Sequence, residues 1–275
     1  MQNKPSLISP LSFFILSFVL SWLIWIPLDL SHFGIGPFHI SETASGVVRL
    51  AGVLMPAISA LIIIGLTGGR HALSKLLSRL FIWKVGIQWW AAAIFIQPIL
   101  LIIAGLVYNR LSGQVPITIP PLLSAAEFMI NLIMLLIATL GEEIGWRGVA
   151  LPSLQSKNSP LKASVILGFW WATWHIPFWL LLDTFSQYGL AYLAMNFLFI
   201  VPGTFFITWF FNQTRSSILL PVIFHLVFNV VNTVIFPVTA SPGAYAIFVV
   251  LDWMLMIVIV PRLNSPKMKF QPAGL

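Results

Sequence analysis

The chain has 275 residues, of which 59% are hydrophobic and only 8% are charged, whereas an ordinary globular protein carries about 25% charged residues. This composition excludes a soluble globular domain and predicts an all-α, polytopic membrane protein. The net charge of +7 comes from 14 basic and 7 acidic residues. The chain has no block of Lys and Arg with interleaved aromatic residues, so nucleic acid is not expected as a partner. The chain has no cysteine, so disulfides, thiol catalysis and zinc sites with cysteine ligands are excluded.

Eight stretches are long and apolar enough to cross a bilayer, for which a helix needs roughly 20 mostly apolar residues. In chain order they are 8–28, 47–66, 87–108, 125–144, 163–182, 188–211, 217–236 and 244–260. No small-residue cleavage site follows the first stretch, so it is interpreted as a retained helix. The connections are short, and we find neither a soluble domain nor an internal repeat. Residues 1–275 are therefore interpreted as a single transmembrane domain.

The basic residues predict how the chain is oriented. With eight spans and both termini in the cytoplasm, 12 of the 14 Lys and Arg lie on the cytoplasmic side, and only Arg49 and Arg110 lie outside. This asymmetry is typical of membrane proteins, whose cytoplasmic loops are rich in Lys and Arg. Segment 70–90 mixes basic residues with Leu, Phe and Trp. It predicts a short amphipathic helix at the cytoplasmic interface, as a surface anchor or as a guide for a substrate tail.

Ionisable residues inside membrane-length segments are costly, and they usually face a cavity or one another. Glu143 and Arg147 stand four residues apart, with the glutamate first, which favours an ion pair on a helix. Glu142 points about 100° away from its neighbour and is left to face a site. In the alternative interpretation, both glutamates only cap the cytoplasmic end of the helix and Arg147 is a topology charge.

The next polar residues lie in two later apolar stretches. His175 follows Trp171 by one helical turn, and His225 and Asn229 project from one face of their helix. Each has a plainer explanation, because a lone His is often a hydrogen-bonded core residue and a His–Asn pair can join helices. Their depths along the helices nevertheless agree, so we expect a polar cavity in the cytoplasmic half of the membrane.

These residue types suit hydrolysis by activated water, since the set contains no good nucleophile. Glu142 is expected to act as general base, and His175 to orient or activate the water. His225 and Asn229 are expected to stabilise the oxyanion. Alternatively, Glu142, His175 and His225 are zinc ligands, because two His and one Glu form a known catalytic set. The usual H-E-x-x-H spacing is absent. Both possibilities, a reaction without a cofactor and one with zinc, therefore remain open.

The chain resembles the CAAX prenyl protease and bacteriocin-processing family of intramembrane proteases, also called the ABI or type II CAAX protease family. That family has eight membrane helices and three motifs. Here they read Glu142-Glu143-Ile144-Gly145-Trp146-Arg147, Trp171-Ala172-Thr173-Trp174-His175 and His225-Leu226-Val227-Phe228-Asn229. All three occur in the family's order within a core at about 125–233, and together they are specific.

The resemblance implies that Glu142 activates water and that His175, His225 and Asn229 hold the water and the oxyanion. It implies that Glu143 and Arg147 are a supporting pair. Trp171 matches the aromatic residue of the second motif and is also expected to support the site. It leaves metal dependence open and predicts an endopeptidase for prenylated CAAX-type or other apolar peptides, in a bacterial plasma membrane. One alternative is a non-catalytic immunity or scaffold protein of the same family that binds a peptide. Another is a proton-coupled transporter, against which the lack of an inverted repeat argues.

Overall fold

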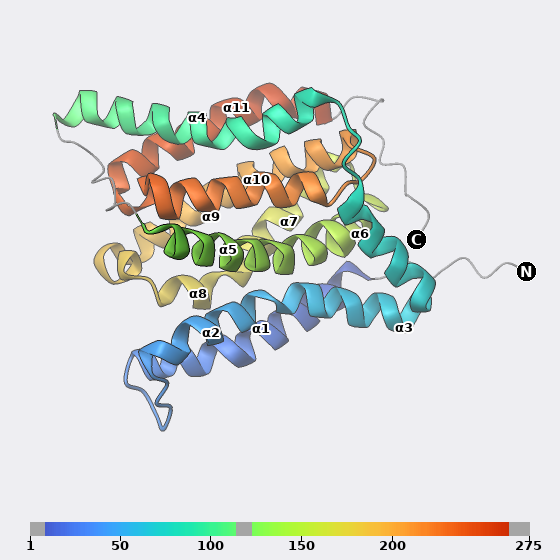
Figure 1. Cartoon of the computed structure of the whole chain (residues 1–275), viewed down its shortest axis with the longest axis horizontal. Helices are drawn as coiled ribbons and strands as arrows, with labels where there is room; N and C mark the ends of the chain where they lie inside the picture. Colours follow the sequence, from blue (N-terminus) through green and yellow to red (C-terminus); the bar gives the residue numbers. More distant parts are fainter. Residues whose placement is uncertain (1–8, 114–122, 264–275) are drawn as a thin grey trace, which may run out of the picture.

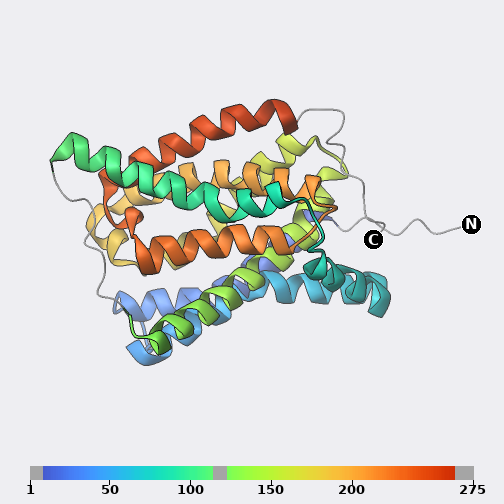
Figure 2. The ribbon, with the colours of Figure 1, turned by 45° about the horizontal axis from the view of Figure 1, so that its top comes forward.

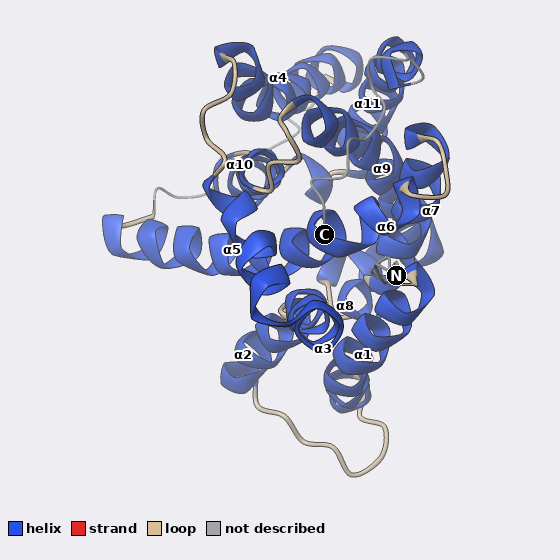
Figure 3. Cartoon of the chain, turned by 90° about the vertical axis from the view of Figure 1, so that its right-hand side faces the viewer, coloured by secondary structure: helices blue, strands red, loops and turns tan. Residues whose placement is uncertain are grey.

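The computed structural model describes residues 9–113 and 123–263, and all regular structure in these two ranges is helical (Figures 1 and 3). In chain order the α-helices are α1 (Pro10–His32), α2 (Glu42–Val53), α3 (Met55–Ser78), α4 (Ile87–Ser112), α5 (Ala125–Gly145), α6 (Leu151–Gln155), α7 (Pro160–Trp174), α8 (Ile176–Leu180), α9 (Asp183–Gln213), α10 (Leu219–Val230) and α11 (Pro242–Leu263). The other helical turns are η1 (Arg79–Phe81), η2 (Trp146–Ala150), η3 (Val231–Ile235) and η4 (Val238–Ala240); η2 and η3 are π-helical.

Six of the eight expected spans correspond to helices that are long and apolar enough to cross a membrane. Within the described residues these are Pro10–His32, Ala44–Phe81, Ile87–Ser112, Ala125–Gln155, Thr184–Gln213 and Pro242–Leu263. The other two expected segments are shorter as helices. Helix α7 has 15 residues and ends at Trp174, and the helix Leu219–Ile235 is shorter than the other six. A multi-pass membrane protein is thus supported, whereas eight spans and a cytoplasmic position of both termini remain predictions.

Several helix limits differ from the expected ones for local reasons. The expected segment 163–182 breaks after Trp174 because Pro177 has no amide hydrogen for the helix ladder, and α8 begins as a new short helix. The expected segment 47–66 is divided between α2 and α3, with Pro56 in the first turn of α3. Gly69, between the expected span 47–66 and the expected amphipathic segment 70–90, has non-helical backbone angles (φ 64°, ψ −162°) and kinks α3. The amphipathic part after it is the end of α3 followed by η1.

Helix α5 lies between the group formed by α1–α3 and helix α10 (Figures 1 and 2). On the other side of α10, helices α4, α9 and α11 pack together, and α7 packs on α9. The outward faces are apolar: Leu23, Leu66 and Ile257 are 68%, 84% and 65% exposed. Such faces fit a lipid environment. In Figure 1 the start of α1 and the end of α11 lie on the same side of the molecule, at the right.

A buried arginine, Arg79 in η1, holds the end of the amphipathic segment 70–90 against this bundle. The side chain of Arg79 is 5% exposed, and its guanidinium donates to the carbonyl oxygens of Ser216, Gly148 and Arg147 at 2.9, 3.1 and 3.2 Å. Ser216 lies in the turn before α10 and has φ of 59°. One side chain therefore joins the π-helical turn after α5 to the turn that starts α10.

We expect Arg79→Ala to lower the free energy of unfolding by about 3 kcal/mol, because it leaves three buried carbonyl oxygens without their charged donor. The measurement is thermal unfolding of the purified protein in detergent. Arg70→Ala, which removes an exposed arginine of the same segment, is the control and should leave the midpoint unchanged. Equal midpoints for the two variants would contradict this account of Arg79.

Candidate active site

The two adjacent glutamates lie near the end of α5 and point to different partners. Helix α5 starts with a capping box between Ser124 and Glu127 and ends against α3. A Cβ atom at Gly145 would lie 2.7 Å from the backbone of Pro56, so only glycine permits this close approach. The tight packing leaves Glu142 5% exposed and Glu143 fully buried.

Glu143 takes part in a buried ion pair and contacts a histidine from another helix. Its Oε1 lies 3.0 Å from Arg147 Nη1, and both side chains are fully buried. The same oxygen lies 2.9 Å from Nδ1 of His225 on α10. Because a carboxylate accepts, Nδ1 of His225 donates this hydrogen bond. The expected pair of Glu143 and Arg147 forms, and His225, which is expected at the oxyanion, also contacts this pair through its other ring nitrogen.

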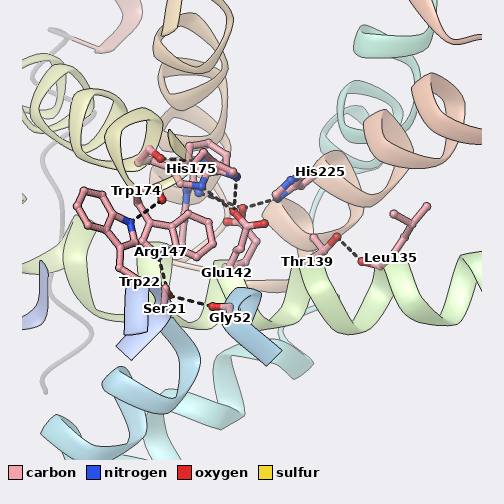
Figure 4. Close-up of polar contacts among 12 residues, drawn as sticks. Ser21, Trp22, Gly52, Leu135, Thr139, Glu142, Arg147, Trp174, His175 and His225 are labelled. Atoms are coloured by element: carbon pink, nitrogen blue, oxygen red, sulfur yellow. Dashed lines mark hydrogen bonds and ion pairs between the residues drawn. The ribbon is translucent and has the colours of Figure 1, made fainter. Parts of the chain in front are cut away.

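Glu142 points to the other histidine. Its Oε2 accepts a hydrogen bond of 2.7 Å from the indole Nε1 of Trp171 on α7 and lies 3.6 Å from Nε2 of His175. His175 Nδ1 lies 2.9 Å from the carbonyl oxygen of Trp171. A carbonyl oxygen only accepts, so Nδ1 carries the hydrogen; in the neutral ring, Nε2 is then the acceptor that faces Glu142. Figure 4 shows His175 and His225 on opposite sides of the α5 carboxylates.

Trp171 contacts Glu142, Arg147 and His225. Besides its bond to Glu142, its ring lies under the guanidinium of Arg147 at 4.3 Å, a favourable cation–π distance. Its ring also meets the His225 ring edge-on at 5.4 Å and 78°. The sequence placed Trp171 on the face of His175, but nothing in the spacing identified it as the donor to Glu142.

A cavity of about 560 Å³ opens beside this cluster. Glu142, Trp171, His175, His225 and Asn229 line one part of it, and Asn229 is half-buried one turn after His225. Most of the remaining lining is apolar and aromatic, from Val53, Leu135, Phe178, Trp179, Phe199, Phe224 and Phe228. The structure therefore brings all four expected catalytic side chains to one cavity, whose size and apolar walls suit a small organic ligand or a short peptide segment.

The residues expected to bind zinc are Glu142, His175 and His225. Among the described residues, no group of three or more His, Asp and Glu side chains is arranged to hold a metal ion. Nδ1 of His225 binds Glu143 and Nδ1 of His175 binds the Trp171 carbonyl, so each ring offers only Nε2 as a ligand. Glu142, His175 and His225 have the right chemistry but do not form an assembled zinc site here.

Comparison with known proteins identifies the same part of the chain. Residues 123–231 match the sequence model of the type II CAAX prenyl endopeptidase Rce1-like family. Over 232 residues the chain is 29% identical to CAAX prenyl protease 2 of Methanococcus maripaludis, a similarity that covers 80% of this chain and 83% of that protein. The resemblance to type II CAAX prenyl endopeptidases is confirmed. The matched segment contains all seven residues of the cluster, from Glu142 to Asn229, and excludes α1 to α4.

Arg147→Ala should reduce the free energy of unfolding by roughly 3–5 kcal/mol, because it leaves Glu143 buried without its cation. Thermal unfolding in detergent is the measurement, with Lys162→Ala, which removes an exposed lysine, as the control. Expression of the Arg147 variant should fall as well. An unchanged midpoint would show that the buried pair does not support the fold.

Proposed function

We propose that this chain is an intramembrane endopeptidase in which Glu142 activates water for attack on a peptide bond. One observation carries the proposal: a carboxylate held by Trp171 at 2.7 Å lies 3.6 Å from an imidazole acceptor, at the wall of a cavity. The similarity to a relative named as a CAAX prenyl protease supports the reaction type.

The attacking water is held between Glu142 Oε2 and His175 Nε2. Both atoms are acceptors, so a water molecule donates one hydrogen to each and turns its lone pairs towards the cavity. As the oxygen attacks the scissile carbonyl carbon, Glu142 takes one proton. The same carboxyl group then delivers that proton to the leaving amine as the C–N bond breaks. Trp171 donates to Glu142 throughout and limits the rotation of its carboxylate.

The oxyanion forms on the side of α10. His225 donates from Nδ1 to Glu143 and, when its ring carries both hydrogens, from Nε2 to the oxyanion. The side-chain amide of Asn229, one turn further along α10, supplies a second donor, which is neutral. Two donors aimed at the developing charge are the usual arrangement for stabilising a tetrahedral intermediate.

The substrate is a peptide that reaches this cavity within the bilayer, and the relative's name makes a prenylated CAAX-type C-terminus the first candidate. The cavity walls agree with an apolar segment, because they are mostly aromatic and aliphatic. We further propose eight spans, with α7–α8 and α10–η3 as the two short ones, and both termini on the cytoplasmic side of a bacterial plasma membrane. In this topology the cavity reaches from Glu142 to Leu182 and Pro237, in the connections on the opposite side of the membrane. In this proposal residues 1–275 form one transmembrane domain, and its catalytic core is at 125–233.

Glu142→Gln should lower kcat for a quenched fluorescent prenylated CAAX peptide by roughly 10²–10⁴-fold, because the amide cannot accept the water's proton. The matched control is Glu127→Gln, the same change at the exposed start of the same helix, where glutamine also serves a capping box. Full activity of the Glu142 variant would refute the proposed base.

The same assay with a strong zinc chelator separates two versions of this chemistry. Activity that survives chelation and is lost in Glu142→Gln supports the glutamate mechanism. Activity lost in both would require a metal. The non-catalytic alternative would be favoured if the wild-type protein binds the prenylated peptide but cuts neither it nor other apolar peptides.

Asn229→Leu should reduce kcat by roughly 10²–10³-fold with little change in KM, because the amide donates to the oxyanion that forms only during reaction. Steady-state kinetics with the same peptide is the measurement. Asn109→Leu, at the exposed end of α4 and away from the cavity, is the control. A change confined to KM would assign Asn229 to substrate binding instead.

A further inference from the structure

A single buried hydroxyl group joins three helices beside the site. The side chain of Ser21, on α1, is fully buried. Its Oγ donates to the carbonyl oxygen of Gly52 on α2 at 2.9 Å and accepts from the indole Nε1 of Trp174 on α7 at 2.8 Å, as Figure 4 shows. A carbonyl only accepts and an indole N–H only donates, so the direction of both bonds is determined.

Trp174 is held by α1 through its backbone as well as its side chain. It is the last residue of α7, and its carbonyl oxygen accepts from the indole Nε1 of Trp22 at 3.1 Å. Its ring is fully buried and packs against the rings of Trp25 and Trp146 at 4.8 and 5.5 Å. A Cβ atom at residue 52 would overlap the Trp25 indole, so Gly52 is needed for this close packing.

His175 follows directly, at the break between α7 and α8. Its ring meets the Trp174 ring edge-on at 4.6 Å and 77° and stacks on Trp179 at 5.1 Å and 8°. At a helix break the hydrogen-bond ladder does not determine the direction of a side chain by itself. The bond from Nδ1 to the Trp171 carbonyl turns Nε2 towards Glu142, and the rings of Trp174 and Trp179 confine the position of the imidazole.

We propose that Ser21 is a positioning residue, which holds Trp174 and thereby aims the His175 imidazole at Glu142. Ser21 lies outside residues 123–231, the segment that matches the family, so α1 contributes to the site although it is not part of that core. The inference rests on the proposed function, in which His175 orients the attacking water.

The first measurement is independent of activity. The full-length chain in detergent, labelled with ¹⁵N at its five histidines, is compared by NMR as wild type, Ser21→Ala and Ser17→Ala. Ser17 is the matched control: it is on the same helix, fully buried, and its Oγ has no hydrogen-bond partner within the described structure. We expect the His175 ring signals to shift in Ser21→Ala only. Unchanged His175 signals, or the same shift in Ser17→Ala, would overturn the proposal.

The second measurement is peptide cleavage. Ser21→Ala should lower kcat about tenfold with KM unchanged, because a displaced group loses reactivity more than binding. Trp174→Phe removes the other half of the same bond and should have a similar effect, and the double variant should be no worse than either, since both remove one interaction. Additive losses, or a normal kcat in Ser21→Ala, would overturn the proposal. If the wild type cleaves nothing, the proposed function fails, and the NMR comparison still decides whether Ser21 positions His175.

Discussion

The buried ion pair between Glu143 and Arg147 is the constraint on which the rest of the site depends. Both side chains are fully buried, and a charge in such surroundings is stable only if it is paired and hydrogen-bonded. The pair therefore requires the end of α5 to lie deep in the bundle, where Gly145 lets α5 approach α3. It also requires His225, and with it α10, to lie close enough to give Oε1 of Glu143 a second donor.

Trp171 extends this constraint to the second carboxylate. Its ring covers the guanidinium of Arg147 while its N–H holds Glu142, so the pair that stabilises the fold and the carboxylate proposed for catalysis share one neighbour. The adjacent glutamates differ in role because of this environment. Glu143 is tied to two cationic or donor groups, whereas Glu142 has a single indole donor, a histidine at 3.6 Å and access to the cavity.

The sequence predicted the helical class, most helix positions and the pairing of Glu143 with Arg147, because apolar length and i,i+4 spacing are local properties. It could not predict contacts between distant helices. The bond from Trp171 to Glu142 spans 29 residues and that from Trp174 to Ser21 spans 153, and no periodicity connects such positions. The expected span 163–182 was interrupted at His175, where Pro177 outweighed the apolar composition. The contact of His225 with Glu143 is likewise absent from the sequence pattern, since it depends on how α10 packs on α5.

The π-helical turn Trp146–Ala150 has a consequence for how this region tolerates changes in length. A π turn accommodates one residue more than the α-helix around it, so the chain that follows is rotated by about 100° relative to an uninterrupted helix. All five residues of α6 are buried in that rotated position, and two of the three carbonyls that Arg79 binds, those of Arg147 and Gly148, belong to the π turn itself. Deleting a single residue here would turn α6 away from its packing surface. Engineered versions of this segment should therefore keep its residue count even where they change its side chains.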